Sequence, residues 1–167
     1  MACKTQTLTG GDFMCDVSMG GVKTIYIANF DDVSELSYDS GKTQITGVTM
    51  ASGKTFVQYN FKRNTASFSS TLNVDPTNYV STDIVMQFSR MDTAKRLEMK
   101  ALSLNDLCVI VEDVNGKKWF FGITMPVSAS AGDAATGTAM TDRNGYSITL
   151  QANELEWAYE FTGEIPA

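Results

Sequence analysis

The alternation of apolar and polar residues predicts a chain of short β-strands. Val57, Tyr59 and Phe61, for example, alternate with Gln58 and Asn60, which is the period of a half-buried strand. Clusters of Gly, Asp, Asn and Ser separate such stretches and indicate turns. Besides a hairpin described next, the expected strands cover residues 22–29, 43–50, 54–61, 66–73, 79–88, 146–151 and 157–162.

Residues 107–124 are predicted to form a β-hairpin near the centre of a sheet. An apolar run from Cys108 to Val111 leads into Asn115-Gly116 and then into an aromatic-rich stretch from Lys117 to Thr124. Asn-Gly suits a type I′ turn, because both residues reach positive φ at low cost. Apolar residues on both sides of the turn indicate that both faces of this hairpin are covered.

Residues 89–105 change to a helical period and are the best helix candidate in the chain. Ser89, with Asp92 three residues later, fits a capping box. One helical stripe collects small and apolar side chains, namely Ala94, Leu97, Ala101 and Leu104. We expect this stripe to be buried, each leucine contributing roughly 1.5–3 kcal/mol, and the helix to cover the 107–124 hairpin.

These elements predict a single domain over residues 1–167 that is mainly β with one helix. The expected architecture is an antiparallel β-barrel or β-sandwich flanked by the α-helix. The chain is long enough to bury a proper core.

Three segments lie outside this pattern. Residues 1–21 are polar and Gly-rich, with a short strand near residues 5–9, and form either a frayed terminus or an arm that orders on a neighbouring subunit. Residues 127–141 are small and are expected to form an exposed loop, which at this length is either a contact element or a passive loop. Asp31, Asp32 and Glu35 form an acid cluster, more typical of a solvated loop than of hydrolytic carboxylates, since no partner group accompanies them.

Composition removes several function classes. The net charge of −6 and the pI of about 4.6 argue against a protein that binds nucleic acid through the phosphate backbone. The absence of histidine removes Ser-His-Asp and Cys-His catalysis and the commonest zinc ligand. Cys3, Cys15 and Cys108 form no C-x-x-C pair and suggest a reducing compartment. We therefore expect no enzyme activity, no metal and no cofactor.

Two further features that the sequence lacks, a membrane span and a signal peptide, bear on where the protein is located. No apolar run approaches 18 residues, so no membrane span is expected. The first residues, Met-Ala-Cys-Lys-Thr-Gln-Thr, lack the apolar stretch of a signal peptide.

Motifs that invite a chemical interpretation are better explained as turns or packing. Gly-Lys-Thr occurs at 41–43 and 53–55, but the earlier glycine of a phosphate loop is missing and a strand follows, so two hairpin turns are expected. Asp-x-Asn-Gly occurs at 113–116 and 142–145 without the acid that closes a calcium loop, so turn chemistry is expected there too. Six aromatic residues are expected to pack in the core or in a subunit interface, and the alternative is that they form a platform on which sugars stack. They are Trp119, Phe120, Phe121, Trp157, Tyr159 and Phe161.

From residue 84 onward, several features follow one another in a characteristic order. A strand is followed by a helix containing Lys95-Arg96, then by Val-Ile-Val-Glu-Asp, Asn-Gly and Lys-Trp-Phe-Phe-Gly. A small-residue loop, Gly137-Thr138 and Asp142-Arg143-Asn144-Gly145-Tyr146 come next, before a closing strand with Glu154, Glu156 and Tyr159. In this order of features the chain resembles tail proteins of tailed bacteriophages, particularly those of gut Bacteroides phages and prophages. The resemblance covers roughly residues 84–162 and rests on turn and strand features.

The resemblance implies a tail-tube-like fold in hexameric rings whose sheets join into a larger barrel, stacked around a channel for DNA. It implies no catalytic residue. The partners would be further copies of the chain and other tail or connector proteins, with DNA passing through without specific binding. The location would be the virion tail after synthesis in the host cytoplasm.

The resulting hypothesis is a structural protein that self-assembles into a tail tube through β-sheet augmentation. Acidic walls would let DNA slide, and the candidate channel acids are Asp31, Asp32 and Glu35. The 1–21 arm, the 127–141 loop and a long 43–61 hairpin are the expected contact segments. Their candidate contact residues are Ser52, Gly53, Ser128, Gly132, Asp133, Thr136 and Gly137. The alternatives are a head-tail connector or tail terminator, or a carbohydrate-binding β-sandwich module using Trp119 or Trp157; a small barrel enzyme or ligand carrier is the weakest.

Overall fold

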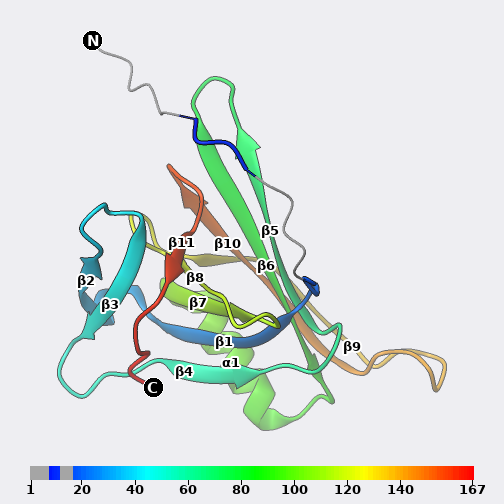
Figure 1. The fold of residues 1–167 in the computed structure, drawn as a ribbon. Coiled ribbons are helices and arrows are strands. Elements are labelled where there is room, and N and C mark those ends of the chain that lie inside the picture. The colour runs from blue at the N-terminus through cyan, green and yellow to red at the C-terminus, as the bar shows by residue number, and fades with distance from the viewer. Residues whose placement is uncertain (1–7, 12–16) are drawn as a thin grey trace.

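The computed structural model describes residues 8–11 and 17–167, and it folds them into two β-sheets and one α-helix (Figure 1). One sheet has seven strands in the order β2-β3-β11-β8-β7-β1-β4, and the other has four in the order β5-β6-β10-β9. All neighbouring strands are antiparallel except the β3–β11 pair. The sheets are not closed into a barrel, so the mainly-β prediction with one helix is confirmed in its sandwich form.

The elements have the following bounds. The strands of the larger sheet are β1 (Val22–Asn29), β2 (Val33–Tyr38), β3 (Gln44–Met50), β4 (Val57–Asn60), β7 (Leu107–Asp113), β8 (Lys118–Phe121) and β11 (Tyr159–Phe161). The strands of the smaller sheet are β5 (Ala66–Asn73), β6 (Tyr79–Ser89), β9 (Ser128–Ala135) and β10 (Gly145–Glu154). A short 3-10 helix, η1 (Phe30–Asp32), joins β1 to β2, and the α-helix is α1 (Thr93–Leu104).

The predicted hairpin at 107–124 is present as β7 and β8, and it lies inside the seven-stranded sheet with both faces covered. Val109 and Val111 pack in one core cluster with residues of the smaller sheet such as Ile84 and Leu150. On the opposite face, Ile110 packs in a second cluster in which β3 and β11 take part. Because β3 and β7 are not neighbours in the sheet, this second core requires the larger sheet to curve over itself.

The cover of this hairpin differs from the prediction. The smaller sheet covers one face, whereas α1 packs mainly against β9 and β10. The turn differs as well, because Gly116 has a positive φ of 84° but Asn115 does not, so it is not of type I′. Instead, the Asp113 carboxylate accepts hydrogen bonds from the backbone N–H groups of Asn115 and Lys117, both at 2.9 Å.

The helix exists where predicted, but its cap and its buried face were predicted wrongly. Ser89 ends β6, and the N-cap is Asp92, whose side chain accepts from the backbone N–H of Lys95 at 2.8 Å. Leu102 is the buried residue of the helix, whereas Leu97 and Leu104 are exposed. The predicted apolar stripe therefore faces away from the core.

Three further expectations are corrected. The predicted 43–61 hairpin does not form, because β3 pairs with β2 and β11 while β4 pairs with β1. Glu35, expected in a loop, lies in β2, and most of the expected 127–141 loop is strand β9. Residues 5–7 of the expected strand near 5–9 and most of the 1–21 arm lie outside the described residues, and residues 8 and 9 are not in a strand. Of that arm, Met19 is tied to the β7–β8 turn, where its N–H donates to Asn115 Oδ1 at 3.0 Å.

Within residues 8–11 and 17–167, no helix is long and apolar enough to cross a membrane.

Candidate functional site

The predicted contact residues Ser128, Gly132 and Asp133 lie on one open edge of the four-stranded sheet. They belong to β9, which pairs along one side with β10, from Ala135 opposite Gly145 to Ser128 opposite Gln151. No other strand of the described chain pairs with the outer side of β9. Its backbone N–H and C=O groups on that side are therefore free to pair with another chain.

The side chains of β9 do little to block such pairing. Its sequence is Ser-Ala-Ser-Ala-Gly-Asp-Ala-Ala, with none of the lysines, prolines or bulky groups by which edge strands usually prevent association. The register shifts between Thr149 and Leu150 of β10, which leaves Ser130 unpaired at a bulge. The regular part of the edge is therefore 131–135.

The opposite edge of the same sheet is β5. It pairs with β6 from Ala66 opposite Met86 to Asn73 opposite Tyr79, and no described strand pairs with its other side. The sheet therefore has two different open edges, which is the arrangement that permits head-to-tail pairing between identical chains.

The solvent face of this sheet is polar, and its four strands contribute no basic residue to it. None of the thirteen Lys and Arg residues of the chain lies in β5, β6, β9 or β10. The pairing registers place a set of short polar side chains on this face, which we call the polar sheet face: Ser67, Ser69, Thr71, Ser81, Asp83, Gln87, Ser147, Thr149 and Gln151. They alternate with core residues such as Ile84 and Leu150, so the two faces have opposite character.

Two of the three acids in these strands are already engaged. Asp133 forms an ion pair with Arg143 at 2.9 Å, and Glu154 accepts from the backbone N–H groups of Ile123 and Thr124 at 2.7 and 3.3 Å. Asp83 is exposed and lies 3.4 Å from Gln151 Nε2. The polar sheet face thus carries a weak negative charge.

Thr136 and Gly137, also predicted as contacts, lie in the connection between β9 and β10. Gly137 has a positive φ of 71°, and the Asp142 carboxylate accepts from the backbone N–H groups of Thr138 and Ala139, both at 2.8 Å. These bonds lower the pKa of Asp142. The connection projects from the body of the molecule as an ordered turn (Figure 1).

The structure does not bring Ser52 and Gly53 to this edge. They lie in the turn between β3 and β4, where Lys54 N–H donates to Ala51 C=O at 3.0 Å. Both residues are exposed, so they remain available for contact, although not as the tip of a β-hairpin.

The predicted channel acids lie outside the four-stranded sheet. Asp31 and Asp32 belong to η1 and Glu35 to β2. Asp32 lies 3.7 Å from Lys54 Nζ and accepts from Asn29 Nδ2 at 3.2 Å. These acids are therefore separate from the polar sheet face.

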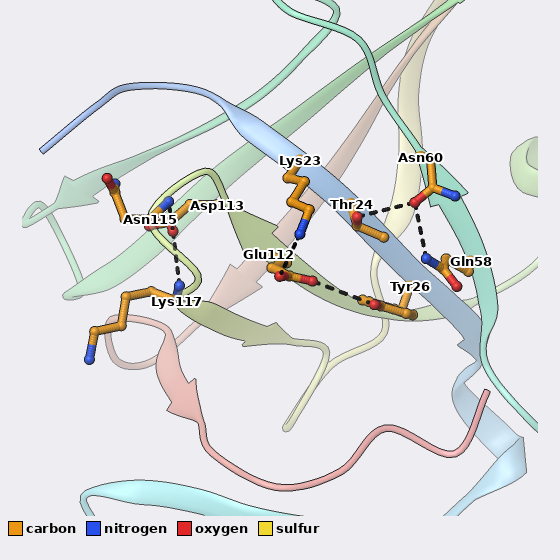
Figure 2. Close-up of polar contacts among 9 residues, drawn as sticks. All are labelled: Lys23, Thr24, Tyr26, Gln58, Asn60, Glu112, Asp113, Asn115 and Lys117. Atoms are coloured by element: carbon orange, nitrogen blue, oxygen red, sulfur yellow. Dashed lines mark hydrogen bonds and ion pairs between the residues drawn. The ribbon is translucent and has the colours of Figure 1, made fainter.

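The seven-stranded sheet has a polar cluster of its own, across β1, β4 and β7 (Figure 2). Lys23 Nζ lies 3.7 Å from Glu112, Tyr26 Oη donates to Glu112 at 3.5 Å, and Thr24 donates to Asn60 Oδ1 at 3.2 Å. Burial, and then the neighbouring Glu112 carboxylate, raises the pKa of Tyr26. These partners satisfy one another, which fits a structural role better than a reactive one.

The β5–β6 hairpin is a projection that the sequence analysis did not single out. Its far end extends beyond the rest of the molecule (Figure 1), and it exposes Leu72, Val74 and Tyr79. The apolar residues next to Asp75-Pro76 were a sequence signal for it. The alternation of apolar and polar residues did not show, however, that the hairpin extends away from the core.

No group of three or more His, Cys, Asp or Glu side chains is placed to hold a metal ion in the part of the chain that the structure describes. Comparisons with protein-family models, characterised proteins and solved structures found no match.

Proposed function

We propose that this chain is a structural protein of a bacteriophage tail, which self-assembles into stacked rings around a channel that conducts DNA. The observation that carries the proposal is the four-stranded sheet, which combines two open edges with a polar solvent face to which its four strands contribute no basic side chain. The resemblance of residues 84–162 to phage tail proteins supplies the context, and the virion tail is the expected location.

Ring formation follows from the two edges. The β9 edge of one copy pairs with the β5 edge of the next, so that the same contact repeats around an axis until the ring closes. The regular segment 131–135 supplies the backbone groups on one side, and Ala66–Asn73 supplies them on the other. Closing the sheet in this way removes the free edges that would otherwise aggregate. The tail-protein resemblance favours six copies.

The channel wall follows from the polar sheet face. DNA binds proteins largely through Lys and Arg, each neutralised phosphate adding to the affinity. A wall of Ser, Thr and Gln side chains with Asp83 offers few such contacts, since Arg143 at its β9 side is paired with Asp133, so DNA can slide along it. In this arrangement Asp31, Asp32 and Glu35 do not lie on the channel wall, because they belong to η1 and β2.

Stacking of rings would use the two projections. The far end of the β5–β6 hairpin exposes Leu72 and Val74, whose burial on a neighbouring ring would favour association. The β9–β10 connection with Thr136 and Gly137 is the second projecting element (Figure 1).

Proline substitutions in β9 test this proposal. Successive backbone N–H groups of a strand point to opposite sides, so one of Ala134 and Ala135 directs its N–H to β10 and the other directs it outward. The outward one tolerates proline without loss of the fold, since edge strands accept it there. We expect that variant to keep its melting temperature and to lose ring assembly in negative-stain electron microscopy, whereas Ala134→Ser assembles normally.

Two results would count against the proposal or narrow it. Normal rings from the proline variant that retains its fold would contradict pairing through β9. Single rings of the wild-type protein that never stack would favour a terminator or a head-tail connector component over a tube subunit.

A further inference from the structure

A pocket of about 350 Å³ lies where the end of β2, the strand β8, the end of β10 and the segment leading into β11 meet. None of its lining residues belongs to β5 or β9. The pocket is independent of the edges and of the polar sheet face. Its size is in the range of small-ligand sites.

Aromatic rings form much of its wall. Tyr38, Phe120, Trp157 and Tyr159 all line the pocket. The rings of Tyr38 and Tyr159 meet edge to face, with centroids 5.9 Å apart, while Trp157 is 55% exposed. A large indole that remains this exposed in a concave site offers a ring face to a ligand.

Two carboxylates complete the wall. Glu154 is fixed by the backbone N–H groups of Ile123 and Thr124, and Glu156 accepts from Tyr159 Oη at 2.7 Å. Burial, and then the charge of Glu154, raises the pKa of Tyr38, which is consistent with a negative potential in the pocket. Lys42 is the one basic residue in its lining.

We propose that this pocket binds an organic cation, a guanidinium or ammonium group carried on an alkyl stem. Aromatic faces attract cations through their quadrupole, and the attraction grows as the cation is desolvated. The two carboxylates add direct charge attraction, and the apolar ring edges accommodate the stem. A saccharide could stack on Trp157, but as a neutral ligand it gains nothing from the net negative charge of the site.

A titration with matched ligands tests this proposal. The probes are N-acetyl-arginine amide, its uncharged analogue N-acetyl-citrulline amide, choline and cellobiose. In a Trp119→Phe variant the fluorescence reports Trp157 alone, because the chain has two tryptophans. Because Trp119 packs against the core, the same titrations are followed by calorimetry on the wild-type protein in case that variant is unstable.

We expect saturable binding of the arginine analogue with a dissociation constant on the order of 1 mM, and binding of the citrulline analogue about tenfold weaker or more. Trp157→Ala should abolish the signal measured by calorimetry, and Glu156→Gln should weaken binding roughly fivefold. Lys42→Met should tighten binding of a cation, since it removes a like charge. Tighter binding of arginine than of choline indicates a protein side chain as the natural ligand, and the reverse indicates a small molecule.

Equal binding of the arginine and citrulline analogues would overturn the proposal, as would binding of cellobiose alone. Absence of saturable binding to any probe in the folded wild-type protein would also overturn it.

Discussion

Replacing Leu102 by alanine should destabilise the protein by about 3 kcal/mol, whereas the same change at Leu97 should cost less than about 0.5 kcal/mol. Leu102 is 3% exposed and packs in the core between the two sheets, while Leu97 on the same helix is 55% exposed. The loss at Leu102 combines the transfer free energy of the removed methyl groups with the cavity that remains. Because both changes are leucine to alanine in α1, their helix-propensity terms cancel in the comparison.

Urea unfolding of the dilute monomer measures the difference. With a slope of roughly 2 kcal/mol/M, the Leu102→Ala midpoint should fall by about 1.5 M, and the Leu97→Ala midpoint should move by less than about 0.25 M. The slope itself should stay unchanged. Equal midpoint shifts would refute the assignment of the buried helix face and would indicate that the stripe containing Leu97 packs in the core.

Three further predictions concern the polar sheet face, a glycine and a turn. Asp83→Lys should leave the fold intact, because its side chain is exposed, but should give assembled rings a salt-dependent affinity for DNA that wild-type rings lack in filter-binding assays. Gly145→Ala should lower the melting temperature by several degrees or prevent folding, because a methyl group there would overlap the carbonyl oxygen of Phe88 in the neighbouring strand. Hydrogen bonds from backbone N–H groups and the Thr43 hydroxyl lower the pKa of Asp39, so its folded pKa lies below the unfolded value of about 3.9. The wild-type protein should therefore be more stable than Asp39→Asn above a pH of about 3.9, and this difference should shrink as the pH falls through the folded pKa of Asp39. Urea midpoints measured across this pH range test the prediction, and a stability difference that does not change with pH would contradict it.

The strands with a core to bury were predictable from the sequence. β5 occupies the predicted residues 66–73, and β7 and β8 form the predicted hairpin, because alternation and apolar runs report burial directly. The two missed strands, β2 and β9, are both edge strands with few buried residues. Their strand conformation comes from backbone hydrogen bonds to the neighbouring strands β3 and β10, and these bonds leave no mark in the pattern of apolar side chains. A small-residue sequence such as that of β9 therefore looks like a loop.

The buried face of the helix was not predictable for a related reason. The α1 sequence allows an apolar stripe through Leu97 and another through Met99 and Leu102, and periodicity alone does not choose between them. The neighbouring strands decide, because the approach of α1 to β9 and β10 buries Leu102 in the core, with Met99 packed against it. That approach depends on tertiary pairing between segments far apart in the chain.

The segment 127–141, predicted to make contacts, has a structure different from the one expected. The 127–141 stretch was expected to act as a long loop, whereas residues 128–135 present a free strand edge. The polar sheet face was visible in the sequence as the alternation of Ser147, Thr149 and Gln151 with core residues. Its continuation across the three strands β5, β6 and β10 became apparent only from the pairing registers.

Negative-stain electron microscopy of the purified protein, combined with its mass in solution, tests self-assembly most directly. Pairing of the β9 and β5 edges predicts rings or tubes with a central channel, formed at high protein concentration and lost in the β9 proline variant that retains the fold. A protein that stays an 18.2 kDa monomer at high concentration would contradict self-assembly through the edges of the four-stranded sheet.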